Sequence, residues 1–69
     1  MYYYSSNLKY GAINLKTVSI ATDKDYVDLG IFCIDFVING GKIKWDYFSK
    51  EIRDKELAEI KAELAKYGG

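Results

Sequence analysis

The sequence lacks the residues that small proteins most often use for cross-links. Its 69 residues contain no histidine, no proline and a single cysteine, Cys33. A disulfide within the chain is therefore impossible, and a zinc site is disfavoured because histidine and cysteine are its usual ligands. Domains of this size bury a marginal core and usually need a cross-link, a metal or self-association. We expect one small domain over residues 1–69, without cofactor or metal, that relies on close packing or oligomerisation.

An excess of charge of one sign is also lacking, since ten basic and ten acidic side chains leave a formal net charge of zero. A strongly electrostatic nucleic-acid binder is disfavoured, because such proteins gain affinity by neutralising phosphates. No apolar run approaches the ~20 residues of a membrane span, and no secretory signal pattern opens the chain. One unpaired cysteine fits a reducing compartment. Together with a composition typical of AT-rich genomes, this predicts a cytoplasmic protein of a bacterium or phage-infected cell.

The clearest pattern in the chain runs from residue 30 to residue 67 and predicts a β-hairpin followed by a helix. Asn39-Gly40 is a strong signal for a two-residue type I′ turn. That turn places Asp35 opposite Lys44, whereas a turn at Gly40-Gly41 places Asp35 opposite Asp46, and facing like charges destabilise a sheet. The Asn39-Gly40 turn also aligns apolar residues of one face in three pairs: Phe32 with Tyr47, Ile34 with Trp45 and Phe36 with Ile43.

Two further strands are expected before this hairpin. The run Asp23-Lys24-Asp25 has the composition of a polar turn, and a turn centred on Asp23-Lys24 predicts four pairs: Ile13 with Ile34, Leu15 with Phe32, Val18 with Leu29 and Ile20 with Val27. The tyrosine-rich N-terminal segment is interpreted as a short edge strand. The predicted strands cover about residues 2–10, 12–22, 26–38 and 42–48.

The closing helix is expected over about residues 54–67. Asp54 is a good N-cap. Ser49 is the rival start, but a helix that begins there would put Arg53 on the apolar face. An apolar stripe follows at helical spacing and comprises Leu57, Ile60, Leu64 and Tyr67. The fold class is therefore α+β, a three- to four-stranded antiparallel β-meander followed by one C-terminal amphipathic α-helix.

The predicted sheet is apolar on both faces, although one helix can cover only one of them. An antiparallel sheet with a solvated face should alternate apolar and polar residues, and a large apolar patch usually marks an interface. We therefore expect the second face to form a homo-oligomer, most simply a dimer. Its predicted interface comprises Val18, Ile20, Val27, Leu29, Ile31, Cys33, Val37 and Phe48. The alternative is that the tyrosine-rich N-terminal segment folds over this face.

The residue inventory gives little support for catalysis. General acid–base chemistry usually needs histidine or paired carboxylates in a pocket, and Cys33 has no predicted base beside it. The acidic run at positions 23, 25 and 28 is too short for a calcium loop. Lys42 and Lys44 alternate with Ile43, Trp45 and Tyr47, so the lysines and the aromatic rings should point to opposite faces. We therefore expect no enzymatic activity and no catalytic residues.

Binding remains the favoured class of function. An exposed N-terminal segment would offer tyrosines and one lysine to a partner, and the candidate residues are Tyr2, Tyr3, Tyr4, Lys9 and Tyr10. The sequence predicts a small homo-oligomeric protein–protein interaction module, an adaptor or inhibitor of phage or mobile-element type with an unidentified protein partner. The alternative is a weak single-stranded nucleic-acid-binding protein. No membrane partner is expected.

Overall fold

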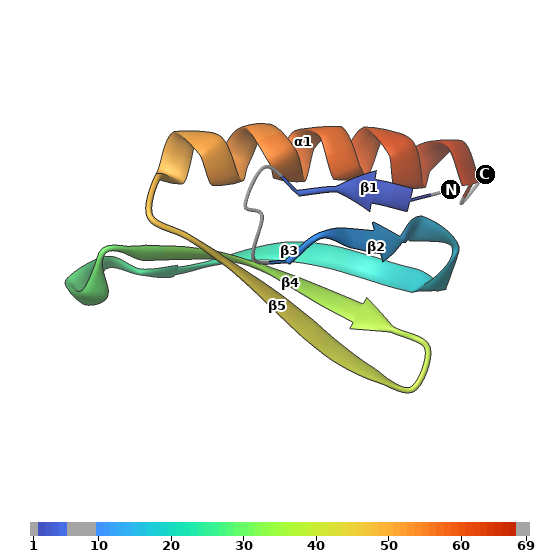
Figure 1. The fold of residues 1–69 in the computed structure, drawn as a ribbon, viewed down its shortest axis with the longest axis horizontal. Coiled ribbons are helices and arrows are strands. Elements are labelled where there is room, and N and C mark those ends of the chain that lie inside the picture. The colour runs from blue at the N-terminus through green and yellow to red at the C-terminus, as the bar shows by residue number, and fades with distance from the viewer. Residues whose placement is uncertain (1, 6–9, 68–69) are drawn as a thin grey trace.

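A computed structural model describes residues 2–5 and 10–67 and shows an α+β fold (Figure 1). The chain forms β1 (Tyr2–Tyr4), β2 (Ala12–Asn14), β3 (Val18–Tyr26), β4 (Ile31–Ile38), β5 (Gly41–Tyr47) and α1 (Lys50–Tyr67), with short 3-10 turns η1 (Leu15–Thr17) and η2 (Val27–Leu29). The strands β3, β4 and β5 make one antiparallel sheet in that order, and β1 and β2 make a separate two-stranded ribbon. The predicted fold class is confirmed.

The β4–β5 hairpin has the predicted register. Asp35 lies opposite Lys44, and Ile38 lies opposite Gly41, so Asn39 and Gly40 form the two-residue turn. The turn type differs from the type I′ prediction, because Gly40 has a positive φ of 88° and Asn39 does not. This combination matches a type II turn. The Asn39 N–H donates to the Thr17 carbonyl at 3.0 Å, which ties the turn to η1.

The predicted β3–β4 connection is wrong by several residues. The turn lies at η2 and ends at Gly30, which has a positive φ of 65° and donates its N–H to the Val27 carbonyl. Gly30 supplies the left-handed conformation that this turn requires. Asp23-Lys24-Asp25 is instead part of strand β3. The observed partners also replace the predicted ones: Val18 pairs with Ile38, Ile20 with Val37, Asp23 with Ile34 and Asp25 with Phe32.

The predicted strand over residues 12–22 is divided in two, and this division moves Ile13 and Leu15 out of the main sheet. Ile13 pairs with Tyr3 in the β1–β2 ribbon, and Leu15 begins η1. The Asn14 side chain accepts from the Lys16 N–H and stabilises that turn. The predicted strand over 2–10 is observed at Tyr2–Tyr4, and residues 6–9 lie outside the described part of the chain.

The inner face of the sheet is the face that carries α1 and the β1–β2 ribbon, and no described element covers the outer face (Figure 1). The ribbon packs with the inner face and the helix, not over the outer face, which excludes the N-terminal cover considered above. The buried core joins all of these elements and comprises Ile13, Leu15, Ala21, Ile34, Phe36, Trp45, Tyr47, Leu57 and Ile60. Burial of such side chains supplies the main driving force of folding.

The helix begins four residues earlier than predicted. Ser49 is its cap, since its hydroxyl accepts from the Ile52 N–H at 3.3 Å and its carbonyl accepts from the Arg53 N–H at 3.0 Å. Asp54 therefore lies inside the helix rather than at its start. Arg53 does face the core, as the Ser49 start requires, and its side chain is fully buried. Leu57 and Ile60 are buried as expected, while the Tyr67 side chain lies outside the described part.

Candidate functional site

The first polar cluster surrounds Arg53, where α1 crosses strands β3 and β4. Its Nη2 lies 2.6 Å from Asp25 Oδ1 and 4.0 Å from Asp23 Oδ2. Its Nε donates to Asp54 Oδ1 at 2.7 Å, and its Nη1 donates to the Cys33 carbonyl at 3.0 Å. The guanidinium thereby joins the helix to two strands, and its donors are directed at the oxygens that arginine prefers.

The charge of Arg53 is stabilised despite its burial. Desolvation lowers the pKa of the guanidinium, but the hydrogen bonds to Asp54 and Asp25 outweigh it and the pKa is raised. The hydrogen bond from Arg53, together with Lys50, holds the pKa of the Asp54 carboxyl below its usual value. A buried cation whose donors point at protein oxygens holds the surrounding elements together, because removing one partner of such a pair is strongly destabilising.

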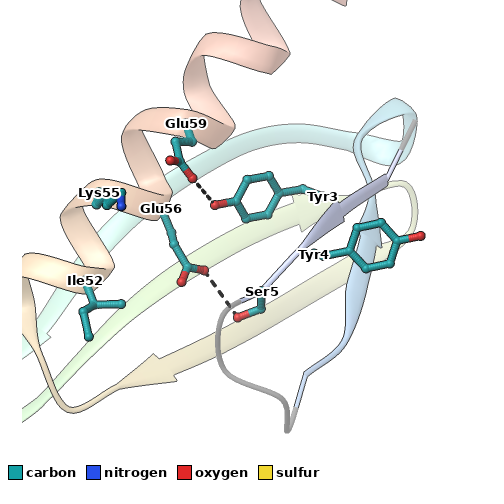
Figure 2. Close-up of a pocket in the computed structure, with 7 residues that line it drawn as sticks. All are labelled: Tyr3, Tyr4, Ser5, Ile52, Lys55, Glu56 and Glu59. Atoms are coloured by element: carbon teal, nitrogen blue, oxygen red, sulfur yellow. Dashed lines mark hydrogen bonds between the residues drawn. The ribbon is translucent and has the colours of Figure 1, made fainter.

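A second polar cluster lines a groove of about 390 Å³ between β1 and α1 (Figure 2). Tyr3 reaches from β1 across the groove, and its hydroxyl donates to Glu59 Oε1 at 2.5 Å. Ser5 Oγ donates to Glu56 Oε1 at 3.3 Å. Tyr4 points away from the helix in the same view, while Ile52 and Lys55 line the helix side. The tyrosine-rich segment is therefore held on the helix by two carboxylates.

Glu56 is buried and also accepts from the Tyr47 hydroxyl at 2.7 Å. Burial, assisted by Glu56, raises the pKa of the Tyr47 hydroxyl, and burial with the hydrogen bond to Glu59 raises that of Tyr3. Both phenols therefore stay protonated and act as donors at neutral pH. This arrangement fastens β1 and β5 to α1, and a buried network of this kind rigidifies the elements that it joins.

The outer face carries a polar bridge that the sequence did not reveal. Lys44 Nζ donates to the Tyr26 hydroxyl at 3.1 Å, and this hydrogen bond raises the pKa of Lys44. The same nitrogen lies 5.1 Å from the centroid of the Tyr26 ring. Because β4 lies between β3 and β5, this contact crosses β4. Lys24 Nζ lies 5.8 Å from the same ring. Long amphipathic side chains of this kind cover apolar surface with their stems.

Cys33 lies on the outer face of β4 and is 1 % exposed although no helix covers it. Lys24 and Asp46 are its neighbours on either side in the sheet. The thiol donates to Asp46 Oδ1 at 3.1 Å, and burial together with this bond raises the pKa of Cys33 to about 11. Since thiolate is the reactive form, the position and the pKa both make Cys33 a poor nucleophile at neutral pH.

The structure places the residues of the predicted oligomer interface in different parts of the fold. Val18 packs with the core on the inner side, and Cys33 is buried. Ile20, Ile31 and Val37 lie on the outer face, where Ile20 and Val37 are cross-strand partners at one end of β4 and Ile31 lies at the other end. The predicted Asp35–Lys44 neighbours are present, but Lys44 bonds to Tyr26, and Asp35 Oδ1 is buried without a hydrogen-bond partner among the described residues.

The three remaining residues of that set gather at one end of the sheet. Val27 and Leu29 in η2 are 73 % and 69 % exposed, and Phe48 after β5 is 85 % exposed. Tyr47 pairs with Phe32 near the start of β4, so Phe48, the next residue, lies at the same end of the sheet as the start of β4. Figure 1 shows η2 at the end where β5 leads into α1. We call Val27, Leu29 and Phe48 the apolar end.

The predicted partner-binding residues also divide into two groups. Tyr2 and Tyr4 are exposed, whereas Tyr3 bonds to Glu59. Tyr10 stacks on Trp45 with ring centroids 5.8 Å apart and accepts from the Asp46 N–H at 2.9 Å, so it supports the core. Lys9 lies outside the described residues. Of this set, Tyr2 and Tyr4 have side chains available to a partner.

Three residues of these clusters escaped the sequence analysis. Arg53 was treated as an argument against the Ser49 start, and Tyr26 was assigned to the wrong strand. Glu56 was given no role, although it is buried in the structure. One signal pointed to the first of these, since an arginine on an apolar helix stripe requires a carboxylate. In the structure, Asp25 and Asp54 are the carboxylates that contact Arg53 most closely.

Comparison with protein-family models, with curated protein sequences and with solved structures found no match to this chain. The described part of the chain has no group of three or more cysteine or carboxylate side chains placed to hold a metal ion. Nor does any helix there combine the length and the apolar character needed to span a lipid bilayer. The polar clusters and the apolar end are therefore the basis for any functional proposal.

Proposed function

We propose that this chain is a non-enzymatic interaction module that joins a second copy of itself through the apolar end. The observation that carries the proposal is the exposure of Val27, Leu29 and Phe48 at one end of the sheet. Exposed apolar groups in one patch mark contact sites on soluble proteins. A chain of 69 residues also gains stability from association more than a larger one would.

The edges of the sheet favour a dimer joined through the apolar end over a dimer in which edge strands of two molecules pair. The free edge of β3 carries Asp23, Lys24 and Asp25 in succession, and charged side chains on an edge discourage pairing with another strand. On the β5 edge, the Asp46 N–H is already bonded to Tyr10. A pair of molecules joined through their apolar ends leaves both edges as they are and follows the self-complementary rule of two-fold dimers.

The polar clusters support a binding role over a catalytic one. The Arg53, Glu56 and Cys33 side chains are each engaged in bonds that hold strands or helix in place. An adaptor or inhibitor would present Tyr2 and Tyr4 twice in such a dimer, which strengthens binding to a partner with two sites. As part of this proposal the protein works in the cytoplasm of a bacterium or phage-infected cell, where the lone cysteine stays reduced.

The test compares Phe48→Asp with Asn39→Asp by sedimentation equilibrium. Both changes add one negative charge at an exposed site, but Asn39 lies in the β4–β5 turn at the other end of β4. We expect Phe48→Asp to be monomeric and Asn39→Asp to associate like the unchanged protein, with the same circular dichroism spectrum for all three. Association of Phe48→Asp at the unchanged strength would contradict the proposal.

A further inference from the structure

We propose that the outer face of the sheet binds single-stranded nucleic acid through Tyr26, Lys24, Lys42 and Lys44. This function is separate from self-association and uses a different surface from the apolar end. No described element covers this face, because α1 and the β1–β2 ribbon both lie on the inner side (Figure 1). The sequence pointed to the N-terminal tyrosines as partner-binding residues, whereas the structure points to the sheet.

Aromatic and cationic groups share this surface, as a stacking platform for unpaired bases requires. The inward-facing rings of Trp45 and Tyr47 are buried and cannot serve. The register of β3 instead brings Tyr26 to the outer face, where two ammonium groups lie 5.1 and 5.8 Å from its ring centroid. A base that stacks on Tyr26 takes the place of one ammonium, and the released lysine then pairs with a phosphate.

The two lysines of β5 lie in a row that the backbone of a nucleic acid can follow. Lys42 and Lys44 are alternate residues of one strand, and their Cα atoms are therefore about 6.8 Å apart. This spacing resembles that of successive phosphates in an extended single strand. A hollow of about 290 Å³ beside them is lined by Lys24, Tyr26, Asp35, Lys42, Ile43 and Lys44. A base that enters the hollow lies next to Lys42 and Lys44.

Asp35 in this hollow favours a nucleobase over a purely anionic ligand. Its Oδ1 is buried and has no hydrogen-bond partner among the described residues. An exocyclic amino group of a base supplies the missing donor. An unsatisfied acceptor is costly, so its satisfaction favours binding. The same carboxylate opposes phosphate, and we therefore expect modest affinity that rises when Asp35 is replaced by asparagine.

The experiment is fluorescence anisotropy of a labelled single-stranded DNA of about 15 nucleotides, a length that spans sites of this kind. It is titrated with the full chain at about 50 mM and about 200 mM salt. Three phosphate contacts predict a slope of log affinity against log salt of about −2. The variants are the double change Lys42→Ala with Lys44→Ala, the single change Tyr26→Leu, and a control of equal charge, Lys16→Ala with Lys61→Ala, at two exposed positions elsewhere.

We expect the Lys42–Lys44 double variant to bind about tenfold more weakly and Tyr26→Leu about fivefold more weakly, the scale of losing phosphate or stacking contacts. The control variant should match the unchanged protein, and Asp35→Asn should bind more tightly. Circular dichroism establishes that each variant is folded. The proposal is overturned by absence of binding at low salt, by equal losses in the control, or by equal competition from polyglutamate, which would indicate an acidic protein partner.

Discussion

The two faces of the β3–β4–β5 sheet are made by the same three strands, yet they are covered in different ways. On the inner face, Ile34 and Phe36 are completely buried beneath α1 and the β1–β2 ribbon. On the outer face, Cys33 is buried by its own sheet neighbours, with the Tyr26–Lys44 contact passing across β4. An apolar position in a central strand can therefore be shielded without a second layer, because long side chains from flanking strands lie over it.

The largest difference between the faces should appear on truncating isoleucine to alanine. Ile34 is completely buried on the inner face, whereas Ile20 is half exposed on the outer face. We expect Ile34→Ala to lower the free energy of unfolding by about 4 kcal/mol, since it leaves a cavity in the core. Ile20→Ala should cost less than about 1 kcal/mol. Urea denaturation followed by circular dichroism measures both, and equal losses would show that the outer face is buried in solution.

The next effect concerns the arginine cluster that fastens α1 to the inner face. Arg53→Met removes the partner of Asp25 and the donor to the Cys33 carbonyl, and we expect a loss of about 3 kcal/mol. The estimate is at the low end for a broken buried pair because Asp25 is partly exposed. Arg53→Lys should lose less, since it keeps the charge but not the forked geometry. Unchanged stability in Arg53→Met, measured by the same denaturation, would contradict the structural role of the cluster.

The rate at which a reagent labels the Cys33 thiol should show whether the Tyr26–Lys44 contact shields it on the outer face. In the unchanged protein we expect a thiol reagent at pH 8 to label Cys33 slowly, because the thiol is buried and its pKa is about 11. Tyr26→Ala removes the bridge to Lys44, and labelling should become about tenfold faster through easier local opening. Lys61→Ala, at an exposed site on α1, serves as the control. Equal labelling rates in Tyr26→Ala and the unchanged protein would show that the bridge does not shield the thiol.

The smallest effect is the pH dependence of the second turn of α1, where Asp54 lies. The hydrogen bond from Arg53 and the nearby Lys50 lower the pKa of Asp54 in the folded chain. The ionised carboxylate therefore adds stability above the unfolded-chain pKa of about 3.8, and this contribution is lost as pH falls through the lower folded value. In Asp54→Asn the decrease in stability between pH 5 and pH 2 should be shallower, as thermal melts would show. An equally steep decrease would assign the acid sensitivity to other carboxylates.

The sequence was sufficient for the parts of the fold that depend on local signals. The β4–β5 register followed from the Asn39-Gly40 turn and from the charges of Asp35 and Lys44. The class of fold and the far end of the helix followed from periodicity. These features depend on residues close in the chain, whose preferences agree with one another.

The two main errors share one cause, which is a long-range contact. Asp23-Lys24-Asp25 looks like a turn and Arg53 looks misplaced on an apolar stripe, as long as each segment is considered alone. In the folded chain the guanidinium bonds to Asp25 and lies within ion-pair distance of Asp23. The acidic run in β3 and the arginine on the apolar stripe of the helix therefore stabilise each other. The candidate site depended on the same register, since the β3–β4 error concealed the meeting of Tyr26 with Lys44.

The central claim, association through the apolar end, is tested most directly by the mass of the unchanged protein in solution. Sedimentation equilibrium over a range from about 10 µM to about 1 mM covers the affinities expected of a small apolar contact. We predict a mass that rises with concentration toward at least twice the 7.9 kDa of one chain. A constant mass of 7.9 kDa across the whole range would contradict the claim.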